Sequence, residues 1–351
     1  MSDAAGAAAR TRRGGVGLNP VDQARENLRS WLHSPRHRGE SQHWRRFNTH
    51  VSRVSELSRF REINATAAEA KTGRLGLDDA RFHIEQQTQE FADQICAIWD
   101  TESIVSVLES QVGLPPVSPI RLSDGRVVET DFNDLRLTHL ALTFAKHHRS
   151  LTADAPLILE IGGGYGALAA KLARLIPNGR FVLTDLAPAG LLQAYYLNEL
   201  FPGAVEVIAN DEPLPNPRSL GTFTLCSPRT LLRRPTTIGG VINTHSFQEM
   251  ERRTIRKYFT FIHAALEPGG VFLNVNRTLK LAFRFVDCPY DDDWNLIESC
   301  GMPKPLGRIW LLATERRNDR NPAFAGWKDQ LPLTSSQPLW KRTVSRLQRL
   351  R

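Results

Sequence analysis

Five residues between positions 160 and 166 have the types and spacing of a loop that cradles a nucleoside cofactor. Glu160 is followed by glycines at three alternate positions, Gly162, Gly164 and Gly166, with Gly163 between the first two. Glycine lets a ligand lie against bare backbone, and a helix that begins directly after the loop offers free N–H groups to it.

Two classes of cofactor use such a loop, and the spacing leaves both open. Glu-x-Gly-x-Gly-x-Gly is typical of S-adenosylmethionine sites, whereas a nicotinamide site reads Gly-x-Gly-x-x-Gly or Ala, which Gly162, Gly164 and Ala167 also satisfy. A glycine turn that only packs a helix on a strand is a third interpretation. Asp185 lies 23 residues after Gly162, where an acid at the end of a strand can accept hydrogen bonds from ribose hydroxyls.

The elements around this loop alternate between strand and helix. Leu157–Ile161 is a short apolar run read as a buried parallel strand, and a helical stripe (Leu168, Leu172, Leu175, Ile176) follows until Pro177. The alternation then predicts a parallel sheet with helices on both faces. Further strands are expected at 180–184, 205–208 or 222–226, 238–243, 271–275 and 309–314, and helices at 191–201, 255–266 and 294–299.

The first third of the chain reads mainly as helix. Residues 1–20 form a basic, low-complexity segment that we expect to be disordered, and 21–130 an accessory region. Its helical stripes are Val51, Val54, Leu57 and Phe60, then Phe91, Ile95, Ile98 and Trp99. Ser123-Asp124-Gly125 is a turn between short extended pieces, and 133–148 a helix. Residues 131–320 would be the cofactor-binding domain and 321–351 a basic tail.

Composition narrows the class of protein. The chain has 351 residues, 41% hydrophobic and 23% charged, with no apolar run long enough to span a membrane and no apolar segment typical of a secretory signal. Four scattered cysteines fit a reducing cytoplasm, where we place the protein. The net charge of +8 sits at the ends, +5 in residues 1–46 and +6 in 315–351, so nucleic-acid binding is not expected.

Several motifs in order resemble class I S-adenosylmethionine-dependent methyltransferases. They are the glycine loop, Asp185 after a second strand, a polar end to the fourth strand and Leu-Glu-Pro-Gly-Gly before the fifth. More narrowly, EIGGGYGALA, TDLAP with LLQAYYLNELFP, and VINTHSFQEM resemble a bacterial family of sugar O-methyltransferases, over about 131–314. One departure is Ala187, which stands between Leu186 and Pro188 where proline would be expected.

The resemblance implies a doubly wound, Rossmann-like sheet of seven mostly parallel strands with one antiparallel edge strand. It implies S-adenosyl-L-methionine as cofactor, and a sugar or glycosylated small molecule as acceptor, in natural-product or polysaccharide biosynthesis. The implied cofactor-binding residues are Glu160, Gly162, Gly163, Gly164, Gly166, Asp185, Leu186, Asn243 and Thr244.

The same resemblance places the segment after the fourth strand beside the transferred methyl group. His245 is the first candidate for general base because it titrates nearest neutral pH, Glu249 is the second, and Gln248 could orient a hydroxyl. A structural histidine and a charge at a helix start are the alternatives for His245 and Glu249.

Other functions stay open on the sequence alone. A nicotinamide oxidoreductase would use the second glycine pattern but lacks a Tyr-x-x-x-Lys pair, and a nucleic-acid-binding protein or methyltransferase would need basic residues beside the cofactor. Asp287 and Asp291–Asp293 invite a metal site, but consecutive acids rarely point at one centre, so no metal is expected. An oligomer is possible.

Overall fold

The computed structural model describes residues 19–32, 57–61, 77–108, 112–148, 156–209, 212, 214–215, 220–233, 236–280 and 283–331. Nearly all of the predicted tail at 1–20 lies outside these ranges, as do Val51, Val54 and the last twenty residues of the predicted tail at 321–351.

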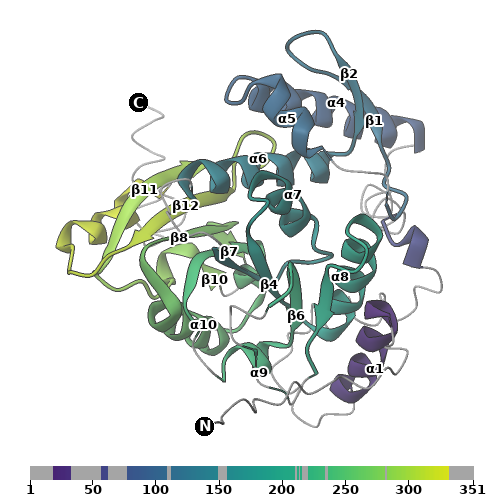
Figure 1. Ribbon diagram of the computed structural model, residues 1–351. Helices are drawn as coiled ribbons and strands as arrows, with labels where there is room; N and C mark the ends of the chain where they lie inside the picture. Colours follow the sequence, from purple (N-terminus) through teal and green to yellow (C-terminus); the bar gives the residue numbers. More distant parts are fainter. Residues whose placement is uncertain are drawn as a thin grey trace, which may run out of the picture.

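One eight-stranded sheet forms the centre of the molecule (Figure 1). Every strand runs parallel to its neighbours except β12, which is antiparallel to β8 and β11. In spatial order the strands are β11 (Trp294–Gly301), β12 (Ile309–Arg316), β8 (Leu266–Arg277), β7 (Ile238–Thr244), β3 (Leu157–Ile161), β4 (Arg180–Thr184), β6 (Phe223–Cys226) and β5 (Val205–Val207).

The predicted fold class is confirmed, and three details differ. The sheet has eight strands, not seven, because both candidates for the third strand pair in parallel, β6 beside β4 and β5 at the edge. The antiparallel strand β12 lies one position in from the other edge. The glycines expected as a turn before the fifth strand instead begin β8, at a break in its register with β7.

The helix predicted at Trp294–Ser299 is wrong: these residues belong to β11. They form an antiparallel ladder with β12, from Trp294 opposite Arg316 to Gly301 opposite Trp310. Six residues are too few for periodicity to separate a buried strand from a helix, so pairing with β12 decides.

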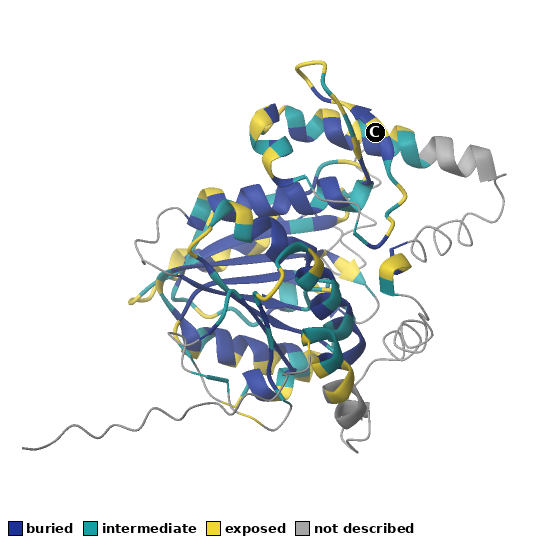
Figure 2. Cartoon of the chain, turned by 45° about the vertical axis from the view of Figure 1, so that its right-hand side comes forward, coloured by how far each residue is buried: buried dark blue, intermediate teal, exposed yellow. Residues whose placement is uncertain are grey.

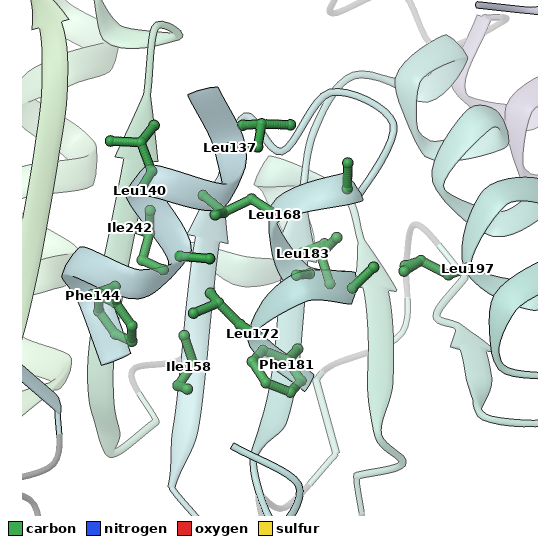
Figure 3. Packing of buried hydrophobic residues seen from close by; sticks show 14 of the residues in the cluster. Leu137, Leu140, Phe144, Ile158, Leu168, Leu172, Phe181, Leu183, Leu197 and Ile242 are labelled. Carbon is green, nitrogen blue, oxygen red and sulfur yellow. The ribbon is translucent and has the colours of Figure 1, made fainter. Parts of the chain in front are cut away.

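Helices cover both faces of the sheet because its strands alternate in side-chain direction. Along β3, Ile158 joins the core beneath α6 (Phe132–His148), α7 (Ala167–Leu175) and α8 (Ala187–Leu200), as Figure 3 shows. Leu159 and Ile161 join the opposite core, beneath α10 (Arg252–Ala265). The predicted helix at 133–148 is confirmed, with Leu137, Leu140 and Phe144 buried on one face.

The described residues of the accessory region form three α-helices and a hairpin, and Figure 2 shows their burial. Helix α4 (Leu77–Cys96) and α5 (Thr101–Val107) share a small core with α6 that includes Phe91 and Ile95 of the predicted stripe. Ile98 is 53% exposed, against prediction, because α4 ends two residues before it. Helix α1 (Pro20–Leu32) packs beside α8. The predicted turn joins β1 (Ser118–Arg121) to β2 (Val127–Thr130).

The remaining described elements are short, and one lies at the start of the predicted basic tail. Residues Pro322–Gln330 form a 3-10 helix (η6) that buries Phe324 and Trp327 in the core under α10. The others are α9 (Pro228–Leu231), β9 (Leu279–Lys280), β10 (Phe283–Arg284), and the 3-10 helices η2 (Leu57–Arg59), η4 (Phe247–Glu249) and η5 (Phe285–Asp287).

A buried ion pair joins the accessory helices to the sheet. Lys171 of α7 has no exposed surface, and its Nζ lies 2.6 Å from Asp134 Oδ1 of α6 and donates to the Val107 carbonyl of α5 at 2.7 Å. The pair therefore fixes three helices against one another.

We expect Lys171→Met to lower the free energy of unfolding by about 3–5 kcal/mol, because it leaves the Asp134 carboxylate buried without its cation. Adding Asp134→Asn should recover much of that loss, and urea unfolding of both variants measures it. A loss below about 1 kcal/mol, the range of exposed ion pairs, would contradict this role.

Candidate functional site

The candidate site lies where the chain changes direction across the sheet. From β3 the chain builds β4 and β6 on one side, then returns to place β7 and β8 on the other. Ligands of open α/β sheets bind outside the carboxyl ends of the strands at this switch point. The glycine loop leaves β3 there, and the segment of His245 leaves β7 beside it.

The glycine loop has a backbone that only glycine adopts easily. Gly162, Gly164 and Gly166 have φ angles of +71°, +60° and +91°. A Cβ on Gly162 would overlap the Ser246 side chain, so the segment after β7 packs directly on the loop at this glycine. A Cβ on Gly164 would meet nothing within 4 Å, so that glycine borders open space.

Asp185 lies at the end of β4, as predicted, and reaches across to the loop. Its Oδ2 accepts the Gly164 N–H at 2.9 Å and its Oδ1 accepts the Leu186 N–H at 2.7 Å. Burial raises its pKa to about 7, against the opposing effect of these two hydrogen bonds, and the charge of Glu249 raises it further. Glu249 therefore lies within electrostatic reach of the predicted ribose-binding carboxylate.

Glu160 places a second buried carboxyl group under the same loop. Burial, with a contribution from the charge of Asp185, raises its pKa to about 8. Its Oε2 has no hydrogen-bond partner among the described residues, and a Cβ on Gly163 would come within 2.9 Å of its Cδ. Two acidic groups are thus held next to the glycine loop, with an acceptor atom to spare.

Sequence reasoning missed a buried amide network that holds the strand ends together. Asn276 Nδ2 donates to Asn243 Oδ1 and to Asn274 Oδ1, both at 2.8 Å, and Asn243 Nδ2 donates to the Ile161 carbonyl at 2.9 Å. The three amides have no exposed surface. Two asparagines at alternate positions of an apolar strand, opposite a third at the end of its neighbour, are the signal that could have revealed it.

This network gives the predicted cofactor residue Asn243 a positioning role. Its amide also donates to Ser246 Oγ and accepts the Phe247 N–H at 3.3 Å, so it folds the chain that follows β7 back onto β3. Thr244 is half-buried at the end of β7. The predicted contacts of Asn243 and Thr244 with a cofactor stay predictions.

His245 sits in a left-handed turn directly after β7. Its φ is +61°, and its N–H donates to the Val275 carbonyl of β8 at 2.7 Å. Burial lowers the imidazole pKa well below its usual value, and the charges of Arg136, Arg277 and Lys280 lower it further. The imidazole is therefore neutral at pH 7, which frees it to accept a proton but makes it a weaker base than an exposed histidine.

The other two predicted catalytic residues are engaged by the end of β8 and the hairpin after it. Glu249 Oε1 lies 2.5 Å from Lys280 Nζ. Gln248 Oε1 accepts the Arg277 N–H at 2.8 Å, and its own N–H donates to Asn276 Oδ1 at 3.1 Å. Gln248 thus anchors η4 to β8, and Glu249 is the more available of the two for chemistry.

The consecutive aspartates that were considered for a metal site form ion pairs with arginines. Asp291 and Asp293 pair with Arg316, and Asp292 lies 3.7 Å from Arg320. Within the ranges that the structure describes, no group of three or more His, Cys, Asp and Glu side chains is placed to hold a metal ion. No helix in the same ranges is long and apolar enough to cross a membrane.

Comparison with known proteins finds similar solved structures but no matching family. No model of a protein family matches the chain, and no curated protein matches it. Among solved structures, the pyocyanin biosynthetic protein PhzM is 13% identical over 53% of this chain and 57% of its own, with a TM-score of 0.35. Mitomycin 7-O-methyltransferase MmcR is 15% identical over 53% of this chain and 57% of its own, with a TM-score of 0.32.

A third structure is the Burkholderia thailandensis 1,6-didemethyltoxoflavin-N1-methyltransferase, solved with 1,6-didemethyltoxoflavin and S-adenosylhomocysteine. It is 14% identical over 52% of this chain and 78% of its own, with a TM-score of 0.38. The chain thus spans 57% of the length of the first two structures. All three TM-scores are below 0.5.

The raised pKa values of the two buried carboxyl groups predict a pH-dependent stability. Between the unfolded pKa near 4.5 and the folded pKa of about 8, the folded chain holds a proton on Glu160 that the unfolded chain releases. Stability should therefore fall as pH rises from about 5 to about 8, by at least about 1 kcal/mol.

Glu160→Gln removes this titration, so its unfolding curve should vary less with pH than that of the wild type over the same range. Chemical denaturation at several pH values measures the difference. Parallel pH profiles for the two proteins would show that Glu160 is not protonated in the folded state.

Proposed function

We propose that this protein is an S-adenosylmethionine-dependent methyltransferase that transfers a methyl group to a hydroxyl of a sugar or glycosylated small molecule. The observation that carries the proposal is the pair of buried carboxyl groups, Glu160 and Asp185, beside the glycine loop. S-adenosylmethionine carries a sulfonium and an ammonium group, so acidic neighbours suit it.

Glu160 argues against the nicotinamide alternative. A dinucleotide lays its pyrophosphate on the glycine loop and the helix N-terminus that follows. Here that anion would meet Glu160, whose Oε2 has no partner among the described residues. An anion would hold the proton on Glu160, whereas a cation would favour the ionised carboxylate, so the loop suits a cationic ligand better.

The residues present fit this cofactor. Gly164 borders open space, Glu160 offers an unused acceptor, and Asp185 has lone pairs left for ribose hydroxyls after it has accepted two backbone N–H groups. The bound cofactor would supply an electrophilic methyl group. The task of the chain is then to hold the acceptor oxygen in line with that group, and such positioning supplies much of the acceleration.

Proton removal from the acceptor hydroxyl falls to the segment after β7. His245 is neutral and in a fixed turn, so it can take the proton directly. Glu249 is the second candidate, and Lys280 holds its carboxylate in place. A positioned base contributes about 10²–10⁴-fold to the rate. The accessory region would select the acceptor, since its residue Arg61, in the turn after η2, lies over the Tyr165 ring of the glycine loop.

Calorimetric titration with S-adenosylhomocysteine, with NADH as the competing ligand, tests the cofactor. We expect binding of the first alone, weakened about 10- to 100-fold by Asp185→Ala, because hydrogen bonds to a charged group contribute about 1.5–3 kcal/mol. Asp124→Ala, in the exposed turn between β1 and β2, is the matched control and should bind as the wild type does. Binding of NADH instead would overturn the proposal.

Transfer of a labelled methyl group to a panel of sugars and glycosides identifies the acceptor and tests the base. With that acceptor, the His245→Ala, Glu249→Gln double variant should lose about 10²–10⁴-fold in kcat and keep its affinity for S-adenosylhomocysteine. If His245 is the base, kcat of the wild type should stay constant down to pH values below 6.5, because its folded pKa lies below that value. Full activity of the double variant would exclude both residues.

A further inference from the structure

Cations from two separate parts of the chain act electrostatically on His245. Arg136 comes from α6, Arg277 ends β8 and Lys280 lies in β9. We call these three residues the cationic rim. Each acts electrostatically on the imidazole, and within the described ranges no carboxylate acts on it in the opposite sense.

Arg136 has a binding capacity that the protein itself does not use. Its Nη2 donates to Asn133 Oδ1 at 2.6 Å, and Asn133 Nδ2 donates to the Tyr165 hydroxyl at 3.1 Å, so the guanidinium is fixed next to the glycine loop. Its Nη1 is buried with no hydrogen-bond partner among the described residues. A buried N–H group of a cation is costly to leave unpaired, so the atom is suited to an oxyanion.

Arg277 adds an exposed charge at the same edge. Its backbone is held by Gln248 Oε1, while its side chain is exposed and forms no ion pair within the part of the chain that the structure describes. Lys280 is the partly neutralised member of the rim, because Glu249 lies 2.5 Å from its Nζ. Of the nearby carboxyl groups, Asp185 accepts the Gly164 N–H, and Asp131 is paired with Arg61.

We propose that the acceptor is anionic and that Arg136 and Arg277 bind its carboxylate or phosphate group beside His245. The inference rests on the proposed function, since it names the substrate class of the same site. A planar guanidinium fork matches both oxyanions, and binding by two of them would orient the acceptor hydroxyl toward the base. A neutral sugar would offer the Arg136 Nη1 only an uncharged acceptor, which makes the weaker hydrogen bond.

The test is calorimetric titration of the full chain with three probes, glucuronate, glucose 1-phosphate and neutral methyl glucoside, each with and without S-adenosylhomocysteine. We expect glucuronate, glucose 1-phosphate or both to bind at least about 10-fold more tightly than the neutral sugar, and the preferred anion to identify the group. Binding should weaken as salt increases from about 50 to 500 mM.

Three variants localise the effect. Arg277→Gln should lower the affinity for the anion about 10-fold or more. Arg136→Lys keeps the charge but loses the guanidinium fork, so it should lower this affinity as well. Arg121→Gln, an exposed arginine on β1, should change nothing. A cooperative thermal melt and an unchanged affinity for S-adenosylhomocysteine would show that the Arg136→Lys variant is folded.

Equal affinity for the charged and neutral sugars, or unchanged anion binding in both rim variants, would overturn the inference. The two proposals can fail separately. Binding of the anion without binding of S-adenosylhomocysteine would support the cationic rim and contradict the proposed cofactor. Binding of S-adenosylhomocysteine without binding of either anion would support the proposed cofactor and contradict the cationic rim.

Discussion

The site depends on one buried interaction, the hydrogen-bonded amides of Asn243, Asn274 and Asn276. They join the carboxyl ends of β7 and β8, and Asn243 extends the connection to the last carbonyl of β3. A buried polar network is stabilising only when its members are satisfied, so it tolerates one arrangement of these strand ends. That arrangement brings Ser246 against Gly162 and sets the left-handed turn at His245.

Around this fixed point the acidic and basic groups have different neighbours. Glu160 and Asp185 lie at the glycine loop, while Arg136, Arg277 and Lys280 act electrostatically on His245. Glu249 stands between the two groups, paired with Lys280 and within electrostatic reach of Asp185. Such a division suits a reaction between a cationic donor and an anionic acceptor, since each half of the site attracts one of them.

Local sequence predicted most of the elements that carry the site. The strand at Leu157–Ile161, the glycine loop and the acid at the end of the next strand all follow from short-range patterns, and all lie where expected. Local patterns failed for short segments and for segments that pair with distant parts of the chain. Trp294–Ser299 is a strand because β12 lies beside it, and Ile98 is exposed because α4 has already ended.

The sequence by itself determined the fold class, the two strands beside the glycine loop and the loop itself, because hydrophobic periodicity and glycine spacing are local properties. Only the tertiary structure decided the surroundings of the candidate residues. Asn274 and Asn276 meet Asn243 through the pairing of β7 with β8, and Arg136 reaches His245 from a helix 109 positions earlier in the chain. Burial and neighbouring charge set the pKa of a side chain, and both come from packing between segments that are far apart in sequence.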